Sequence, residues 1–383
     1  MPLPLLTQQN VEALSPGQRE KVKHPALGSP AFAAGYRMPA EWAPHLATYL
    51  VWPHNRDTWP GKFEAIPPVF ARMAAAIAEF EPVRLLVSDE ATADRARAAI
   101  VETAGAAARV DRIAFTIVPT NDSWIRDYGP IFVNRAAPTN VPPQVALDFG
   151  FNSWGEKYGA YDLDDAVPRR LGERLGFDVL EPPMVLEGGS IDVDGAGTLL
   201  TTESCLLNPN RNPALDRAEI ERRLKYWLGV STVLWLGEGI AGDDTDGHVD
   251  DLARFVAPAT VVTVIEDDPR DENHHVLAEN LRRLRAMRDA AGRALTVETL
   301  PMPPALFHDG TRVPASYANF YIVNGGVIVP TFDCQQDAAA IATLGRLFPG
   351  RRVVGIPSRD LVWGLGAIHC LTQQHPLPPV DRV

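Results

Sequence analysis

The residues most able to do chemistry are spread along the chain, and the first is a cysteine near its end. Cys370 lies in the stretch Gly-Leu-Gly-Ala-Ile-His-Cys-Leu-Thr-Gln-Gln, which covers residues 364–374. A thiol on a glycine-rich loop is a candidate nucleophile. The alternative is a buried cysteine that packs as a small hydrophobic residue. The other polar residues of the chain decide between the two.

Two further candidates follow short apolar segments that are predicted to be strands, and a third precedes a predicted pair of short strands around Gly325-Gly326. Catalytic residues commonly lie on loops that a rigid sheet positions. The three are Asp127 in Asn-Asp-Ser-Trp-Ile-Arg-Asp-Tyr-Gly-Pro (121–130), Glu187 in Glu-Gly-Gly-Ser (187–190) and Asn319 in Ser-Tyr-Ala-Asn (316–319). For the first segment, the alternative is a solvated turn capped by Asp122, in which Arg126 pairs with Asp127.

His248 and Asp250 form another candidate pair. Alternate residues of a strand face the same side, so the two side chains could point into one pocket. Several acids precede them, among them Asp243, Asp244 and Asp246. A Ca²⁺ loop is one alternative, although the EF-hand spacing and its closing glutamate are missing. A Zn²⁺ site is another, but no second histidine lies at helical spacing.

Together these residues indicate a thiol that attacks a cationic carbon. In this hypothesis Cys370 is the nucleophile, His248 the acid and base, and Glu187 orients the histidine, while Asp127 and Asp250 line the same pocket. Carboxylates raise the pKa of a nearby thiol above its ordinary value of about 8.5. Such a site makes sense if the substrate brings the positive charge. A guanidinium group is planar and matches carboxylates two hydrogen bonds at a time.

The elements that must position these residues are short strands that alternate with helices. The chemical candidates Asp127, Glu187, His248, Asn319 and Cys370 are 51–71 residues apart, which indicates a recurring strand–helix–strand unit. A recurring unit favours a closed, radially repeated architecture, whereas a (β/α)₈ barrel needs a unit of only about 30 residues. The predicted strands are 46–52, 83–87, 113–118, 145–149, 197–202, 232–236, 261–265 and 353–356; the predicted helices are 67–80, 91–101, 162–175, 213–228, 272–289 and 335–347.

Composition excludes several classes of protein. The chain is 46% hydrophobic and 22% charged, which is typical of a soluble globular protein. Its net charge of −12 argues against nucleic acid or an anionic membrane as a partner. No apolar run of about 18 residues and no signal peptide is visible, so we expect a cytoplasmic protein. No clear linker divides the chain, and we expect an irregular proline-rich arm (1–37) followed by a single domain (38–383).

At this point the sequence resembles the agmatine deiminases, in the guanidine-modifying superfamily that also holds bacterial peptidyl-arginine deiminase. The resemblance runs almost from end to end. The matching stretches are Met-Pro-Ala-Glu-Trp (38–42), Trp-Pro-His (52–54), Asn-Asp-Ser-Trp-Ile-Arg-Asp-Tyr-Gly-Pro (121–130), Leu-Glu-Gly-Gly-Ser-Ile (186–191), Cys-Leu-Leu-Asn-Pro-Asn-Arg-Asn-Pro (205–213), Thr-Asp-Gly-His-Val-Asp (245–250), Ser-Tyr-Ala-Asn-Phe-Tyr (316–321) and Ile-His-Cys-Leu-Thr-Gln-Gln (368–374).

The resemblance implies an α/β fold, a five-bladed propeller of ββαβ-like units around a central active site, with no metal and no organic cofactor. It places the nucleophile at Cys370, the acid and base at His248, the guanidinium-binding carboxylates at Asp127 and Asp250, and Glu187 beside the histidine. The expected reaction is hydrolysis of agmatine to N-carbamoylputrescine and ammonia through a thiouronium intermediate. We also expect a homo-oligomer, either a dimer or a tetramer.

Three more residues are expected to help bind this substrate. Trp124 would pack against its aliphatic chain, Asp244 would meet its distal ammonium, and Asn319 would support the site by hydrogen bonding. Plain core packing is the alternative for Trp124, and capping of a strand end is the alternative for Asn319.

One departure from the family keeps other functions open. Leu365 and Ala367 stand where the family usually has glycine, and their Cβ atoms restrict φ and fill space. The alternatives are a peptidyl-arginine or free-arginine deiminase, for which Arg126 could meet the α-carboxylate, a non-catalytic protein that binds polyamine-like cations, and a metal-dependent hydrolase. We expect Cys205 and Cys334 to have no chemical role.

Overall fold

The computed structural model describes residues 35–105, 108–135 and 142–379, and these residues form an α/β fold. Residues 1–34 of the expected arm lie outside the described residues. Tyr36–Arg37, at the end of that arm, pair with a later strand as β1, so these two residues are not irregular. No helix in the described ranges is long and apolar enough to cross a membrane.

Short strands pair into five sheets of three or four strands, with one separate hairpin, over the described residues. The first sheet has the order β19-β2-β3-β4 and the second the order β1-β5-β6-β7; the other three are β10-β9-β8, β11-β12-β13 and β16-β17-β18. The strands are β1 (Tyr36–Arg37), β2 (His45–Val51), β3 (Val83–Val87), β4 (Ile113–Ile117), β5 (Ile131–Arg135), β6 (Gln144–Leu147), β7 (Val179–Leu180), β8 (Asp192–Val193), β9 (Thr198–Thr202), β10 (Thr232–Leu236), β11 (Ala253–Ala257), β12 (Thr260–Ile265), β13 (Thr296–Pro301), β16 (Tyr321–Val323), β17 (Gly326–Thr331), β18 (Arg352–Pro357) and β19 (Gln373–Pro376), and the hairpin consists of β14 (Leu306–His308) and β15 (Thr311–Val313).

Three of these sheets repeat the same local pattern. In each, an antiparallel hairpin is followed by a helix and then by a strand that pairs in parallel, as in β11, β12, helix α11 (Asn273–Ala286) and β13. A parallel pair needs such a crossover, because the chain must return to the same end of the sheet. The same order recurs around α10 (Arg217–Leu228) and α12 (Gln336–Leu347).

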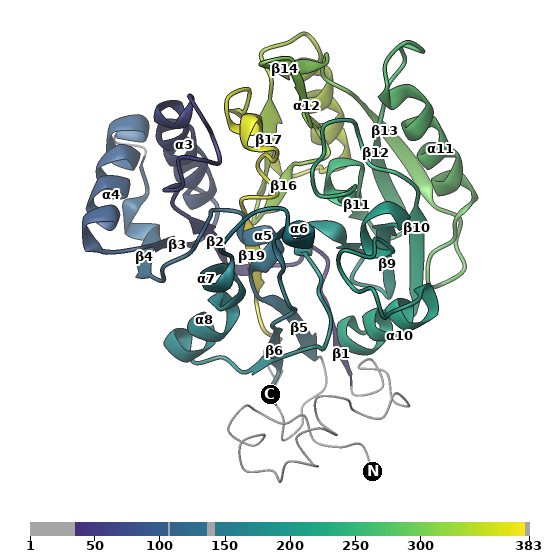
Figure 1. The fold of residues 1–383 in the computed structure, drawn as a ribbon, viewed down its shortest axis with the longest axis horizontal. Coiled ribbons are helices and arrows are strands. Elements are labelled where there is room, and N and C mark those ends of the chain that lie inside the picture. The colour runs from purple at the N-terminus through teal and green to yellow at the C-terminus, as the bar shows by residue number, and fades with distance from the viewer. Residues whose placement is uncertain (1–34, 106–107, 136–141, 380–383) are drawn as a thin grey trace.

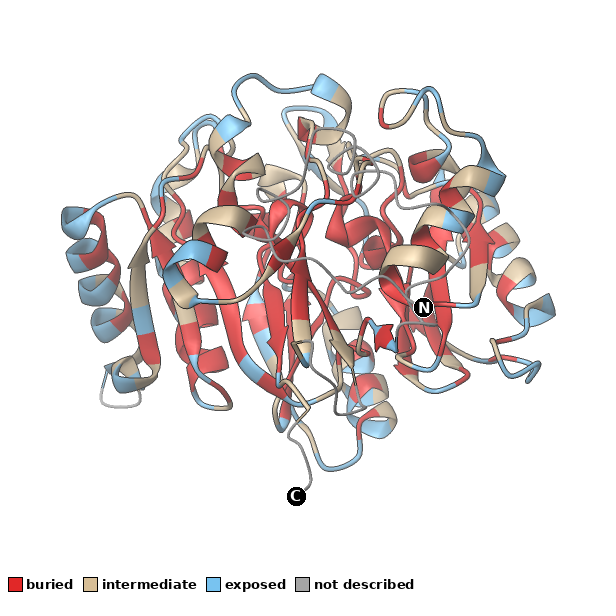
Figure 2. Cartoon of the chain, turned by 90° about the horizontal axis from the view of Figure 1, so that it is seen from below, coloured by how far each residue is buried: buried red, intermediate tan, exposed pale blue. Residues whose placement is uncertain are grey.

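The helices lie on the outside of this arrangement, and the site-bearing turns lie near its middle (Figure 1). Long helices flank the sheets, including α3 (Ile66–Ala78), α4 (Glu90–Ala104) and α8 (Val167–Leu175), while the short turn α5 (Ile125–Tyr128) lies centrally. Most central strands are buried, whereas β4, β13 and β18 are partly exposed, and the outer helices combine a buried side with an exposed side (Figure 2). A central position for α5 therefore brings the turn that carries Asp127 into the interior.

Residues from both ends of the described chain meet in the first sheet. β19 pairs antiparallel with β2, and Gln373 lies opposite Tyr49. A buried polar cluster supports this junction, since Glu81 accepts hydrogen bonds from Asn324 and Thr48 and lies 2.9 Å from His45 Nδ1. The strand that follows the nucleophile is therefore anchored at the start of the fold.

Most predicted elements agree with the structure to within a few residues. The predicted strands 83–87 and 232–236 coincide with β3 and β10. The predicted helix 162–175 is interrupted instead, because α7 (Asp162–Asp165) and α8 are separate helices. Sequence analysis did not identify β5, β11, β19 or the β14–β15 hairpin.

The strand expected to carry His248 and Asp250 is wrong. Asp246 and Gly247 have φ values of 66° and 100°, so the chain turns sharply, and a 3₁₀ helix, η6 (Val249–Asp251), follows. The backbone N–H of His248 donates to Asp243 Oδ2 and Thr245 Oγ1, both at 3.1 Å. Side-chain acceptors in the acidic segment thus stabilise a turn where alternation suggested a strand.

Candidate active site

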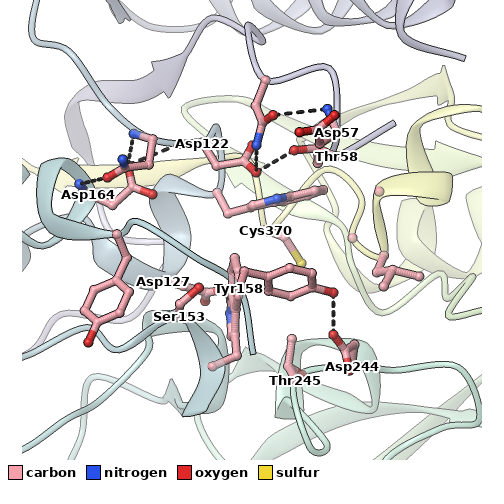
Figure 3. A pocket seen from close by; sticks show the side chains of 18 of the residues that line it. Asp57, Thr58, Asp122, Asp127, Ser153, Tyr158, Asp164, Asp244, Thr245 and Cys370 are labelled. Carbon is pink, nitrogen blue, oxygen red and sulfur yellow. Dashed lines mark hydrogen bonds between the residues drawn. The ribbon is translucent and has the colours of Figure 1, made fainter. Parts of the chain in front are cut away.

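A pocket of about 350 Å³ opens onto the central turns, and Cys370 and Asp127 are among its lining residues (Figure 3). Its lining includes five aspartates and no lysine or arginine among the described residues. The aspartates are Asp57, Asp122, Asp127, Asp164 and Asp244. The pocket is therefore suited to a cation.

The loop that carries Cys370 follows a 3₁₀ helix, η7 (Leu361–Gly364), and packs tightly against two tryptophans. A Cβ on Gly366 would lie 2.6 Å from the Trp124 ring, which explains the need for glycine there. Leu365 has φ 68° and ψ 20°, a left-handed conformation that costs a non-glycine residue about 1–2 kcal/mol. Leu365 also lines the pocket, whereas Ala367 is buried in ordinary backbone geometry.

Acidic and amide groups surround the Cys370 thiol. Asn319 Nδ2 donates to the sulfur at 3.0 Å and to Asp251 Oδ1 at 2.9 Å, while Asp250 Oδ2 lies 3.6 Å from the sulfur. The Asn319 Oδ1 atom accepts the backbone N–H of His369 at 2.9 Å. Asn319 therefore holds the nucleophile loop and the thiol together.

The thiol is buried, and its environment opposes ionisation. Burial, together with the nearby carboxylates of Asp250, Asp251 and Asp127, raises the pKa of Cys370 well above its ordinary value, although the Asn319 hydrogen bond acts in the opposite direction. Cys370 is therefore protonated in the unliganded protein at neutral pH.

Asp127 is held by donors from two other segments. It accepts the backbone N–H of Gly189 at 3.0 Å and the indole N–H of Trp154 at 2.9 Å. Burial raises its pKa to about 6, even though the adjacent His248 favours the ionised form. Asp127 is thus mostly ionised at pH 7.

Trp154 reaches Asp127 from an unusual turn. All four residues of the element α6 (Ser153–Glu156) have positive φ, including 54° at Trp154 and 94° at Gly155. Consecutive left-handed residues are strained for L-amino acids. Asn152 and Asn210 bond to each other and to neighbouring residues in this region, which helps to hold the turn.

His248 and Glu187 lie together in a fully buried cluster. The imidazole Nδ1 lies 3.7 Å from Asp127 Oδ1, and neither ring nitrogen has a hydrogen-bond partner within the described ranges. Burial lowers the pKa of His248, but Asp127, Cys205 and Asp250 outweigh burial and raise the pKa well above its ordinary value. The histidine is therefore charged when the site is empty of substrate.

Arg211 binds the carboxylate of Glu187. Its Nε donates to Glu187 Oε1 at 2.6 Å, its Nη2 donates to the Thr245 carbonyl at 2.8 Å, and its Nη1 pairs with Asp246. The guanidinium thus ties Glu187 to the segment that ends at His248. No partner of Glu187 Oε2 is present in the described part of the chain.

Glycine allows these segments to approach one another. Gly188 and Gly189 belong to the 3₁₀ helix η5 (Gly188–Ser190). A Cβ on Gly189 would lie 2.6 Å from His248 Nδ1, 2.8 Å from Asp127 Oδ1 and 3.1 Å from Asp250 Oδ2. A turn rather than a strand therefore brings His248 and Asp250 together, and neither residue is among those that line the pocket.

The two remaining expected residues lie farther out in the pocket. Trp124 lines the pocket and also packs against Trp59, with ring centroids 5.5 Å apart. Asp244 accepts the Tyr158 hydroxyl at 2.5 Å, as the dashed line in Figure 3 marks, and Lys157 Nζ lies 3.4 Å from its other oxygen. Arg126 does not line the pocket; it donates to Gln374 and to the His369 carbonyl.

Two groups of side chains bring three possible metal-ligand atoms within 4.8 Å of one another in the described residues. One group is Glu187, Cys205 and His248, and the other is Asp250, Asp251 and Cys370. In the first group, the Arg211 guanidinium already binds Glu187, and this cation disfavours a second cation at the same carboxylate.

Comparison with known proteins agrees with this geometry. Residues 37–376 match the family described as Porphyromonas-type peptidyl-arginine deiminase. The chain belongs to this family. Agmatine deiminase from Ectopseudomonas mendocina is 41% identical over 370 residues, which are 90% of this chain and 97% of the relative.

Solved structures of family members have the same fold. Agmatine deiminase of Enterococcus faecalis superposes with a TM-score of 0.83 at 35% identity, covering 91% of this chain and 98% of that one. A C. jejuni agmatine deiminase in which serine replaces a cysteine, solved with substrate bound, gives a TM-score of 0.81 at 30% identity over 90% of this chain and 97% of that one.

Sequence analysis named several of the side chains that the structure brings together, but it missed others that surround them. Glu41, Arg211 and His369 were visible within matched motifs, and no role was given to them. Cys205 was expected to be a simple core residue, and it is fully buried, yet it contacts the His248 cluster. No pattern indicated Trp154 or Tyr158.

The first prediction concerns the protonation of the nucleophile. We expect the thiol of Cys370 to remain protonated up to and beyond about pH 8.5 in the unliganded protein, because buried carboxylates surround it. The difference in ultraviolet thiolate absorbance between wild type and Cys370→Ala measures this thiol alone. A thiolate step below pH 8 in that difference would contradict the expectation.

Proposed function

We propose that this chain is an agmatine deiminase that hydrolyses agmatine to N-carbamoylputrescine and ammonia through Cys370. The observation that carries the proposal is a buried thiol among carboxylates at a pocket whose described lining has five aspartates and no basic residue. The names of the relatives support the same substrate.

Substrate binding supplies the positive charge for which the site is built. In this proposal Asp127 and Asp250 accept hydrogen bonds from the guanidinium, and Trp124 packs against the aliphatic chain. Each charge-assisted hydrogen bond contributes about 1.5–3 kcal/mol. The bound cation also offsets the carboxylate charges near Cys370, so the thiol releases its proton to solvent as the substrate binds, since His248 is already protonated.

The chemical steps follow from the protonation states. The Cys370 thiolate attacks the guanidinium carbon and forms a C–S bond in a neutral tetrahedral adduct. Protonated His248 gives its proton to one amino group, the C–N bond breaks, and ammonia leaves a cationic thiouronium on the sulfur. Neutral His248 then takes a proton from water as its oxygen attacks the same carbon. The C–S bond breaks, the thiolate is released, and loss of one proton gives the carbamoyl product.

Glu187 and Asn319 support His248 and Cys370 without reacting themselves. Glu187, held by Arg211, lies beside His248 and favours the charged imidazole that must donate the proton. Asn319 donates to the Cys370 sulfur and would stabilise the thiolate.

Arginine and peptidyl-arginine are less suitable substrates. Free arginine would need a cation for its α-carboxylate, but Arg126 points elsewhere and the described lining has no lysine or arginine. Asp244 and Asp57, by contrast, present carboxylates that could meet the distal ammonium of agmatine. We assign the distal ammonium to Asp244, whose carboxylate lines the pocket beside Tyr158, and Asp57 is the alternative carboxylate.

For the architecture we propose a five-bladed propeller formed by a single catalytic domain over residues 38–383. The five sheets of three or four strands and the recurring hairpin–helix–strand order support it. We further propose that the protein needs no cofactor, because every reacting group of the mechanism is a side chain, the substrate or water. We also propose that it is cytoplasmic and forms a dimer or a tetramer.

The central test measures ureido product from agmatine, arginine and a peptidyl-arginine in parallel. We expect turnover of agmatine alone, and a loss of at least about 10³-fold in Cys370→Ala because the nucleophile is gone. Cys334→Ala, which removes a cysteine outside the pocket, is the matched control and should retain activity. No turnover of any guanidine by folded wild-type protein would refute the deiminase assignment.

The pKa of Asp127 predicts the acid side of the pH profile. Burial raises this pKa to about 6, and the carboxyl is ionised above that value. We therefore expect kcat/KM for agmatine to fall about tenfold per pH unit below pH 6, because a protonated carboxyl cannot neutralise the guanidinium. In kcat the midpoint should lie at lower pH, since bound substrate favours the carboxylate. A kcat/KM that stays constant from pH 7 to pH 5 would disprove this role.

Asp244→Asn tests the assignment of the distal ammonium. Because Asp244 is partly exposed, we expect its loss to raise KM for agmatine only about two- to fivefold. KM for butylguanidine, which lacks the distal ammonium, should not change. Asp57→Asn removes another pocket carboxylate as a control; a selective effect on agmatine in that variant instead would move the assignment to Asp57.

A further inference from the structure

A buried histidine that the proposed mechanism does not use lies next to the nucleophile. His369 precedes Cys370, and its side chain is only 2% exposed. Its Nδ1 lies 2.7 Å from Asp250 Oδ2, and its Nε2 lies 2.8 Å from Glu41 Oε2. The imidazole thus bridges Asp250, whose Oδ2 lies 3.6 Å from the Cys370 sulfur, and the carboxylate of Glu41.

This bridge requires two donors from one ring. A neutral imidazole has one N–H and one acceptor nitrogen, so it can donate to only one of the two carboxylates. The imidazolium donates from both nitrogens and matches both acceptors. The contacts of His369 with carboxylate oxygens at both ring nitrogens therefore match a ring with an N–H on each nitrogen.

The carboxylate of Glu41 is fixed on several sides. Glu41 Oε1 accepts the backbone N–H of Ile322 at 2.8 Å, and Glu41 Oε2 accepts Arg254 Nη2 at 2.8 Å with Arg126 Nη2 at 3.6 Å. Burial favours the neutral acid, but Arg254, His369 and Arg126 outweigh it and hold the pKa of Glu41 well below its ordinary value. Glu41 is therefore a rigid, ionised anchor for the histidine.

His369 also orients the carboxylate of Asp250. Asp250 Oδ2 faces His369, whereas Oδ1 is buried and has no partner within the described residues. Burial raises the pKa of Asp250, but the hydrogen bond and charge of His369, together with the charges of His248 and Arg254, lower it by more. One oxygen is therefore held in place, and the other stays free for a guanidinium N–H.

We propose that His369 is a positioning residue that orients Asp250 for guanidinium binding and is itself anchored by Glu41. The proposal rests on the proposed function, because Asp250 is taken there as a substrate carboxylate. His369 touches neither the substrate nor the reacting atoms in this scheme, and it acts through Asp250. Its effect should therefore appear in KM more than in kcat.

His369→Gln tests the role directly. Glutamine can donate to Asp250 only by turning its carbonyl toward Glu41, where two acceptors would oppose each other. We expect KM for agmatine to rise about 10- to 100-fold, as for the loss of a hydrogen bond between charged groups, with a smaller fall in kcat. A folded variant whose KM stays within threefold of wild type would overturn the proposal.

His375→Gln is the matched control. His375 is buried in β19 and also makes two side-chain interactions, with the Tyr49 hydroxyl at 2.9 Å and Gln144 Oε1 at 2.8 Å. Neither partner is a carboxylate. We expect this variant to lose stability without a change in KM beyond about twofold; an equal rise in KM would mean that the effect of His369→Gln is structural, and it would refute the positioning role.

Glu41→Gln provides a second test that keeps the shape of the bridge. Its amide can donate to a neutral His369, so both contacts persist while the charge is lost. We expect KM to rise less than in His369→Gln, and the double variant to resemble His369→Gln, because the anchor acts through the histidine. Multiplicative effects of the two changes would contradict the bridge.

Failure of the positioning role of His369 can be distinguished from failure of the proposed agmatine deiminase function. If His369→Gln does not fold, Glu41→Gln decides: a raised KM supports the bridge, and a wild-type KM overturns it. Normal turnover in wild type with unchanged variants rejects the positioning role alone. Absence of agmatine turnover in folded wild type rejects the proposed function, and the role of His369 with it.

Discussion

Burial of several carboxylates around one thiol is the constraint on which the rest of this structure depends. An ionised carboxylate removed from water costs several kcal/mol unless cations or N–H donors compensate it. Here the compensation comes from the deep interior: Arg211 binds Glu187, while Arg254 and His369 bind Glu41. The partners of Glu41 are 213 and 328 residues away in the sequence, so its charge is balanced only after distant segments have packed together.

These cations do not neutralise the carboxylates of Asp127 and Asp250 completely. Asp250 Oδ1 is buried without a partner in the described part of the structure, and Asp127 has a raised pKa because it is buried. A planar cation placed there satisfies these groups and lowers the cost of ionising Cys370 in the same event. The positive charge of the substrate therefore both strengthens its binding and favours ionisation of Cys370. A neutral isostere of agmatine would have neither effect.

Features that depend on neighbouring residues were predictable from the sequence, and features that depend on distant pairings were not. Apolar runs such as Val83–Val87 predicted strands directly, and glycine next to polar residues indicated the turns at Glu187 and Cys370. The strand β19 has the polar sequence Gln-Gln-His-Pro, and only its pairing with β2 makes it a strand. The bond from Arg254 to Glu41 spans 213 residues, and no local pattern contains it. Trp154 reaches Asp127 only through a left-handed turn that propensity disfavours.

The pairing of β19 with β2 also determines the stage of synthesis at which the site can form. Gln373 and Tyr49 are partners in one sheet, although they lie far apart in the sequence. Other sheets can form as the chain emerges, but Cys370 and the strand that anchors it are synthesised after Asp127, Glu187 and Asp250. A nascent chain therefore carries these acids before it carries the thiol, and the charged cluster can close only after the segment with Cys370 has emerged. Such non-local closure also favours slow folding, since the loop between the partners must close before either gains a contact.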